Sequence, residues 1–166
     1  MTLSSRLAAA EKVLELRYET LNDAKKRLAI TDDILAKTAL RQRIREEVLP
    51  EIRQCEAEYW DLLAQEAGSC TVEEVDARIA IVEVVGEVEL IENQPATKYP
   101  DELMRLLREI RDKLNEPGTP AAAKAKFAIP LIPGILAYEV ELDTENTLRK
   151  VLQPIQRLFR DAAEKK

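Results

Sequence analysis

Four leucines spaced seven residues apart constrain most strongly what this chain can fold into. Leu7, Leu14, Leu21 and Leu28 recur at that interval, and residues 1–30 contain neither glycine nor proline. An apolar repeat of this period keeps one seam of a helix turned toward a partner helix. The segment is therefore predicted to form a long amphipathic helix with a coiled-coil-like seam.

A second helix is predicted directly after the first one. Asp32 and Asp33 carry oxygen atoms suited to capping its amino terminus. Pro50 lies inside its apolar pattern, so a kink is expected there. A short connection between two long helices indicates an antiparallel helical hairpin, assigned here to residues 1–67 and ended by Gly68. The apolar residues follow steps of four and three, which is typical of a helix: Leu40, Ile44, Val48, Ile52, Cys55, Tyr59 and Leu62.

Residues 71–92 carry two conflicting patterns. Thr71 and Glu74 fit a capping box, which predicts a helix. The alternation of valine and glutamate from Val82 onward, together with many β-branched side chains, favours a strand instead. Both structures therefore stay open for this segment. It holds seven acidic residues and one basic residue, a net charge of −6 that equals the total for the whole chain.

The rest of the chain is predicted to form a smaller α(+β) region over residues 68–166. A helix is expected near residues 101–115 and a last helix near residues 145–160, capped by Asp143 and Thr144. Residues 124–129 and 135–142 look extended and are separated by a Pro-Leu-Ile-Pro-Gly segment, which predicts a short β-hairpin. The expected fold is thus mainly α, with a helical hairpin followed by this smaller part.

The composition removes the commonest catalytic arrangements. The chain has no histidine, so it contains no Ser-His-Asp or Cys-His pair and no histidine-ligated metal. Cys55 and Cys70 lie fifteen residues apart, without the spacing of a zinc or redox motif. We therefore assign no catalytic residue, no cofactor and no metal ligand, and expect a protein that is not an enzyme.

Charge and hydropathy also bear on partners and location. A net charge of −6, with basic clusters interleaved by acids, argues against nucleic-acid binding. The amino terminus runs into charged helical sequence, and the apolar run from Phe127 to Tyr138 is shorter than the roughly 18 residues of a membrane span. A cytoplasmic protein without a membrane span is expected.

Two alternatives to a purely structural role come from the carboxyl-terminal half. On a strand, Glu139, Glu141 and Asp143 would share one face, and three carboxylates can bind Mg²⁺ or Ca²⁺. The alternative function is therefore a divalent-metal-binding enzyme or sensor. A second alternative is a peripheral membrane-binding module that uses the apolar run from Phe127 to Tyr138.

The favoured function is protein–protein interaction and oligomerisation. The leucine seam can close the hairpin or meet another protein, and Trp60 is equally consistent with a core residue and an interface anchor. The Pro-Gly-bent segment offers further apolar side chains. The candidate interaction residues are Leu7, Leu14, Leu21, Leu28, Trp60, Ile132 and Leu136.

The segment Lys126-Phe127-Ala128-Ile129-Pro130-Leu131-Ile132-Pro133-Gly134-Ile135-Leu136-Ala137-Tyr138-Glu139-Val140-Glu141-Leu142-Asp143-Thr144-Glu145 resembles a region of multidomain signalling and conflict proteins of cyanobacterial type. In those proteins similar regions stand beside STAND/NACHT-type NTPase, TIR or caspase-like CHAT modules, often after a helical hairpin. The resemblance implies an effector-associated adaptor. Its partner would be a second copy of itself, or an effector or NTPase module. The four glycines of this chain form no Walker-type loop.

Overall fold

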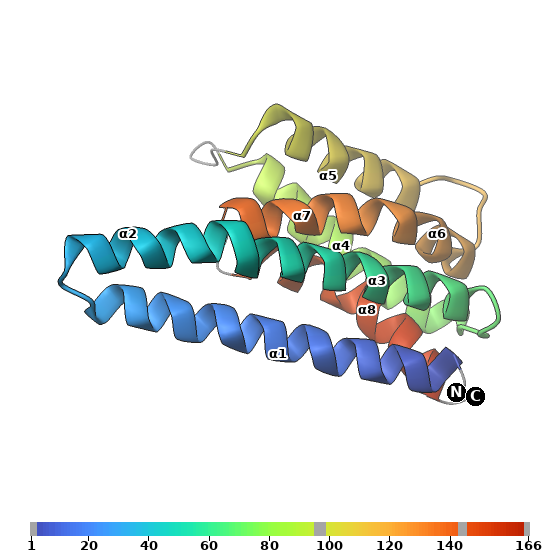
Figure 1. The fold of residues 1–166 in the computed structure, drawn as a ribbon. Coiled ribbons are helices and arrows are strands. Elements are labelled where there is room, and N and C mark those ends of the chain that lie inside the picture. Colours follow the sequence, from blue (N-terminus) through green and yellow to red (C-terminus); the bar gives the residue numbers. More distant parts are fainter. Residues whose placement is uncertain (1–2, 95–98, 143–145, 165–166) are drawn as a thin grey trace. The chain divides into compact units, whose positions relative to one another are not determined.

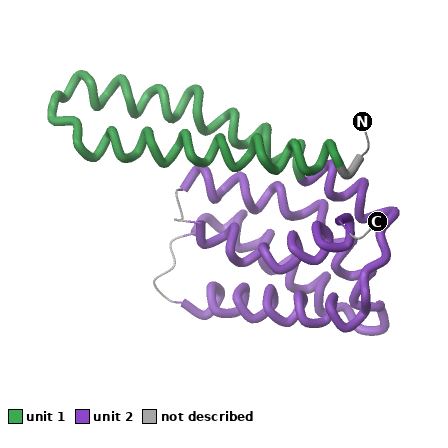
Figure 2. Tube along the Cα trace, turned by 90° about the horizontal axis from the view of Figure 1, so that it is seen from below, with its two compact units in different colours: residues 1–59 green, residues 60–166 purple. Residues whose placement is uncertain are grey.

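The chain is helical almost throughout in the computed structural model, which describes residues 3–94, 99–142 and 146–164 (Figure 1). No strand occurs within these ranges. The chain divides into two compact units (Figure 2). We call residues 1–59 the hairpin unit and residues 60–166 the bundle unit. The predicted boundary at residue 67 coincides with a helix end, whereas the division between the units falls inside that helix.

The hairpin unit is built from two long helical arms. The first arm is α1 (Leu3–Ile30), and Figure 1 shows the second arm returning beside it. The second arm begins with α2 (Ile34–Arg43), where Asp33 caps the amino terminus and accepts a hydrogen bond of 3.3 Å from the Leu35 amide. The sequence-based prediction of two helices joined through an Asp cap is confirmed.

A wide helical turn precedes Pro50 in the second arm. A π-helical segment η1 (Ile44–Val48) separates α2 from α3 (Leu49–Ala67), and the Leu49 amide donates to the Ile44 carbonyl five residues earlier. Proline has no amide hydrogen and its ring crowds the carbonyl four residues before it. A π-turn is one of the local irregularities that accommodate such a residue. The arm is helical on both sides of this turn and ends at Ala67.

Two polar contacts hold α1 against α3 within the hairpin unit. The Tyr18 hydroxyl donates to Glu56 Oε1 at 2.7 Å, and Glu56 is buried. One turn of α3 earlier, Arg17 pairs with Glu51 at 3.3 Å. A buried carboxylate needs a donor, so the first contact fixes the register of the two arms more strongly than the second, which is exposed.

The bundle unit is organised around α4 (Glu74–Glu92). This helix packs against α5 (Asp101–Leu114), α6 (Ala121–Ala128) and α8 (Thr147–Glu164). A 3₁₀ turn η2 (Ile129–Leu131) leads into α7 (Ile132–Leu142), which packs on α5 and α8. The open question over residues 71–92 is thereby decided for a helix. Its buried side chains fall on one helical face, so packing outweighs their strand propensity: Ala77, Ala80, Ile81, Val84, Val88 and Ile91.

The extended structure predicted for residues 124–129 and 135–142 is not observed. Those residues lie in α6, η2 and α7, and no β-hairpin is seen among the residues that the structure describes. Pro130 and Pro133 lie in the first turns of η2 and α7, where a missing amide hydrogen removes little bonding. The buried side chains of this stretch recur at helical intervals, which the local strand-like alternation concealed.

Two glutamates cap helices to which they do not belong. Glu139 of α7 is only 4% exposed and its carboxylate lies at the amino terminus of α8. Its Oε1 accepts from the amides of Leu148 at 2.9 Å and Arg149 at 3.2 Å, and its Oε2 accepts from the Asn146 amide at 3.1 Å. A negative charge there satisfies free amides and complements the helix dipole. The expected caps, Asp143 and Thr144, lie outside the described residues.

Glu74 does the same for α6. Its carboxylate accepts from the Ala121 amide at 3.0 Å and the Ala122 amide at 2.9 Å. These hydrogen bonds to the charged form lower the pKa of Glu74 below its ordinary value. The first residue of α4 is thus tied to the beginning of a helix 47 residues later in the sequence.

We expect Glu139→Gln to lower the free energy of unfolding by about 1–3 kcal/mol, because an amide group replaces a charged acceptor that binds three backbone amides. Urea denaturation followed by circular dichroism measures this change. Glu141→Gln is the matched control, since Glu141 lies on the same helix and is exposed. Equal effects of the two substitutions would contradict a capping role for Glu139.

The stability contributed by Glu74 should depend on pH. Its folded-state pKa is lower than the unfolded value of 4.5, so the contribution is complete above that value and is lost as the pH falls through the folded pKa. The unfolding free energy of the native chain should therefore exceed that of Glu74→Gln at pH 7, and the difference should shrink toward pH 3. A difference that stays constant across this range would refute the assignment.

Candidate interaction groove

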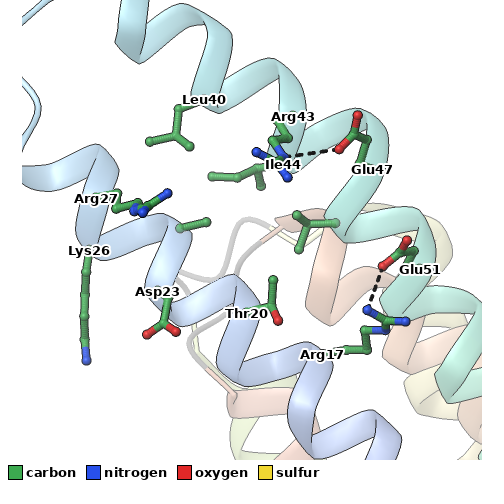
Figure 3. Close-up of a pocket in the computed structure, with 12 residues that line it drawn as sticks. Arg17, Thr20, Asp23, Lys26, Arg27, Leu40, Arg43, Ile44, Glu47 and Glu51 are labelled. Atoms are coloured by element: carbon green, nitrogen blue, oxygen red, sulfur yellow. Dashed lines mark ion pairs between the residues drawn. The ribbon is translucent and has the colours of Figure 1, made fainter.

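The seam between α1 and the second arm stays open toward the tip of the hairpin. Neither α2 nor η1 contains a buried residue. Leu40 and Ile44 point toward α1 (Figure 3). Both of them and Val48 remain half-buried, whereas Ile52, four residues after Val48, is fully buried. The small side chains of Ala24 and Ala36 are among those that border this part of the seam, and they leave it unfilled.

The open seam forms a groove of about 720 Å³ (Figure 3). Its apolar floor consists of Ala24, Leu40, Ile44 and Val48. A smaller hollow of about 440 Å³ continues toward the tip and shares Leu40 with the larger one. We call the two hollows together the hairpin groove. Its size and apolar floor are of the order found at sites that bury a ligand side chain or a helix face.

Charged side chains line both walls of the hairpin groove. On the second arm, Arg43 pairs with Glu47 at 3.2 Å, while Lys26 and Arg27 lie on α1 (Figure 3). The Arg43 pair is exposed and so contributes at most about 1 kcal/mol. Residues 25–45 hold seven basic and two acidic residues, a net charge of +5 in a chain whose total is −6. The larger hollow itself is lined by both signs of charge, because Asp23, Glu47 and Glu51 stand beside its basic residues. The positive charge is concentrated toward the tip, where the charged residues that line the smaller hollow, Arg27 and Arg43, are both basic.

The candidate interaction residues from the sequence are mostly buried. Leu7, Leu14 and Leu21 are buried along α1, and Leu28 is half-buried. Trp60 is 3% exposed, which fits a core residue better than an exposed anchor. Ile132 and Leu136 lie in the core of the bundle unit. These side chains offer little surface to another protein. Association through them is not tested by the structure and stays a prediction.

The residues of the groove floor were recognised in the sequence only as a helical stripe. Leu40, Ile44 and Val48 carry the right spacing, but nothing local shows that their seam stays open. Two sequence signals could have drawn attention to them. One is the alanines at positions 24, 36 and 39 that border the hollows, and the other is the concentration of basic residues over residues 25–45.

Glu139 and Glu141 do not share one face, as the predicted strand would have required. A helix turns about 100° per residue, so Glu139 and Glu141 point about 200° apart on α7 rather than along one face. Glu139 is engaged by the amides of α8, Glu141 is exposed, and Asp143 lies outside the described residues. Within residues 3–94, 99–142 and 146–164, no group of three or more acidic or cysteine side chains could hold a metal ion.

One helical stretch meets the length and composition of a membrane-crossing helix. It runs over 22 residues from Ala121 to Leu142 through α6, η2 and α7. A buried helical stretch of a globular core meets the same criteria, and one side of this stretch is buried. The buried residues of this stretch are Ala121, Ala125, Ala128, Ile129, Ile132, Ile135, Leu136, Glu139 and Val140.

Comparison with models of protein families, with curated proteins and with solved structures finds no match to this chain.

We expect backbone amides of residues 34–48 to exchange with deuterium faster than those of residues 52–63. Local opening is easier where few apolar side chains are buried, and α2 and η1 bury none while Ile52, Tyr59 and Leu63 are fully buried. Mass-spectrometric hydrogen exchange measures both peptides in one experiment. Equal protection of the two stretches would mean that the seam is closed in solution.

Proposed function

We propose that this chain is a non-enzymatic adaptor of a bacterial signalling or defence system, which binds a protein partner through the hairpin groove. The observation that carries the proposal is the apolar floor of Leu40, Ile44 and Val48, which is left half-buried between two charged walls. Covering such a floor is favourable by about 25 cal/mol for each Å² of apolar surface removed from water.

The shape of the groove favours a helix as its occupant. Two roughly antiparallel arms with an unfilled seam present the same surface that a third helix covers in a helical bundle. A helix that brings apolar residues to one face can lie along the floor, while the walls set its orientation through charge. The partner is therefore a protein with an amphipathic or apolar helix face.

The biological setting comes from the segment at residues 126–145. It resembles a region of cyanobacterial-type multidomain proteins in which effector and NTPase modules are linked, and a helical hairpin often precedes it. Its described part forms η2, α7 and the end of α6, which pack into the bundle unit. A helical bundle that is joined in one chain to a hairpin with an open groove suits a scaffolding role in the cytoplasm.

Site-specific photo-crosslinking in cells that produce the chain tests the proposal. A photoreactive amino acid at Ile44, on the groove floor, should give adducts with a protein. The same amino acid at Gln54 is the matched control, because Gln54 is exposed on α3 and is not among the residues that line the groove. Adducts at both positions alike, or at neither, would reject the groove as a binding site.

A second variant separates groove binding from loss of folding. Ile44→Asp places a charge on the floor and should abolish adducts formed from a photoreactive group at Leu40. Circular dichroism should show unchanged helicity, because Ile44 is only half-buried. Adducts that persist in the folded Ile44→Asp variant would show that the partner does not use the floor.

A further inference from the structure

α4 carries apolar side chains on two opposite faces. Its inner face packs in the bundle unit, yet four large apolar residues on the other side, Val75, Ile79, Val82 and Leu90, are between 55% and 70% exposed. At about 100° per residue, these four and Gly86 fall within a sector of about 80°. We call this sector the outer face of α4. A contiguous apolar stripe that is exposed on a helix marks a surface suited to contact with another protein.

Gly86 lies in the middle of the outer face. A Cβ atom at this position would meet nothing within 4 Å, so no neighbouring group requires a glycine there. Glycine inside a helix is unfavourable by about 0.5–1 kcal/mol relative to alanine. A flat position at the centre of an exposed apolar face allows the backbone of another helix to approach closely.

The acidic residues beside the outer face indicate the charge of the surface that can bind it. α4 holds six acidic residues and one basic residue, a net charge of −5. Asp76, Glu83 and Glu87 are exposed along one edge of the apolar stripe. Two outer faces packed against each other would bring these carboxylates together, which disfavours a symmetric pairing through α4. The fitting partner is an apolar surface surrounded by positive charge.

The end of the hairpin groove toward the tip has that chemistry, because the charged residues that line the smaller hollow, Arg27 and Arg43, are both basic. Residues 25–45 carry a net charge of +5, and Lys26 and Arg27 line the wall that α1 contributes. The groove is concave and apolar at its floor, whereas the outer face of α4 is a convex apolar ridge. Shape, polarity and charge are therefore complementary between two surfaces of the same chain.

We propose that the outer face of α4 of one copy docks in the hairpin groove of a second copy. This inference rests on the proposed function, because it names the helix that the groove receives. The two surfaces differ, so a copy that has docked through one of them still carries the other, to which a further copy can bind. The average mass of the assembly therefore grows with concentration. Because the charges at the contact are partly exposed, added salt weakens it.

Sedimentation equilibrium of the full chain tests this pairing. At low salt the average mass should rise with concentration, and it should fall toward the monomer in 1 M salt, where the screening length is about 3 Å. Glu83→Lys/Glu87→Lys reverses the charge beside the outer face of α4. Lys26→Glu/Arg27→Glu reverses the charge on the α1 wall of the hairpin groove. Each double variant alone should remain monomeric, since its ridge and groove then carry like charge.

Mixing the two monomeric variants is the decisive step. The reversed ridge of one variant faces the reversed groove of the other, so association should return in the mixture. This return also shows that both variants are folded. Glu109→Lys/Glu116→Lys makes the same charge change at exposed positions away from α4 and should associate like the native chain. Association that does not return on mixing, or that the control loses equally, would overturn the inference.

Gly86→Gln adds an independent test. It should raise the thermal midpoint of the monomer, because an open glycine is replaced by a better helix former. It should also weaken self-association about tenfold, the change that 1.4 kcal/mol of lost contact produces. A native chain that is monomeric at every soluble concentration at low salt overturns this inference. If Ile44 still gives groove-specific adducts with another protein, the proposed function stands.

Discussion

The removal of one face of α4 from water is the constraint on which the bundle unit depends. α5, α6 and α8 each pack on this helix, and α7 packs on α5 and α8. The burial is purely apolar along α4, so it does not by itself determine where neighbouring helices begin. That information comes from two carboxylates: Glu74 holds the first amides of α6 and Glu139 holds those of α8. Apolar burial, which has no preferred direction, thus holds the helices together, while the directional hydrogen bonds of the two caps determine where α6 and α8 begin.

Much of the fold was predictable because its signals are local. The leucine repeat from Leu7 to Leu28 and the Asp33 cap specify the hairpin, and Asp101 begins α5 as expected. The failures occur where the deciding partner is distant in sequence. The alternation of apolar and acidic side chains over residues 138–142 resembles a strand, but these residues lie in α7, a helix that packs on α5 and α8. Glu139 looked like part of a metal-binding face because its partners, the amides of α8, become neighbours only in the fold.

The candidate site was less predictable than the fold. Spacing identifies Leu40, Ile44 and Val48 as one stripe, but whether a stripe is filled depends on the side chains opposite, and here these include alanines. The leucine seam differs from this stripe. Its regular spacing made it the favoured interaction surface, but Leu7, Leu14 and Leu21 are buried. Charge segregation between residues 25–45 and α4 is visible in the sequence. Its meaning depends on the groove and on the outer face, which only the structure reveals.

The wide turn before Pro50 affects the geometry of the second arm as well as its backbone bonding. In an α-helix, residues four apart drift around the axis by about 40° at each step. Leu40, Ile44, Val48 and Ile52 are spaced in this way, so their row would spiral away from α1 over three steps. The π-turn at Ile44–Val48 has more residues per turn, which reduces that drift. The wide turn before Pro50 therefore also keeps these four side chains nearer to one face of the second arm than an unbroken α-helix would.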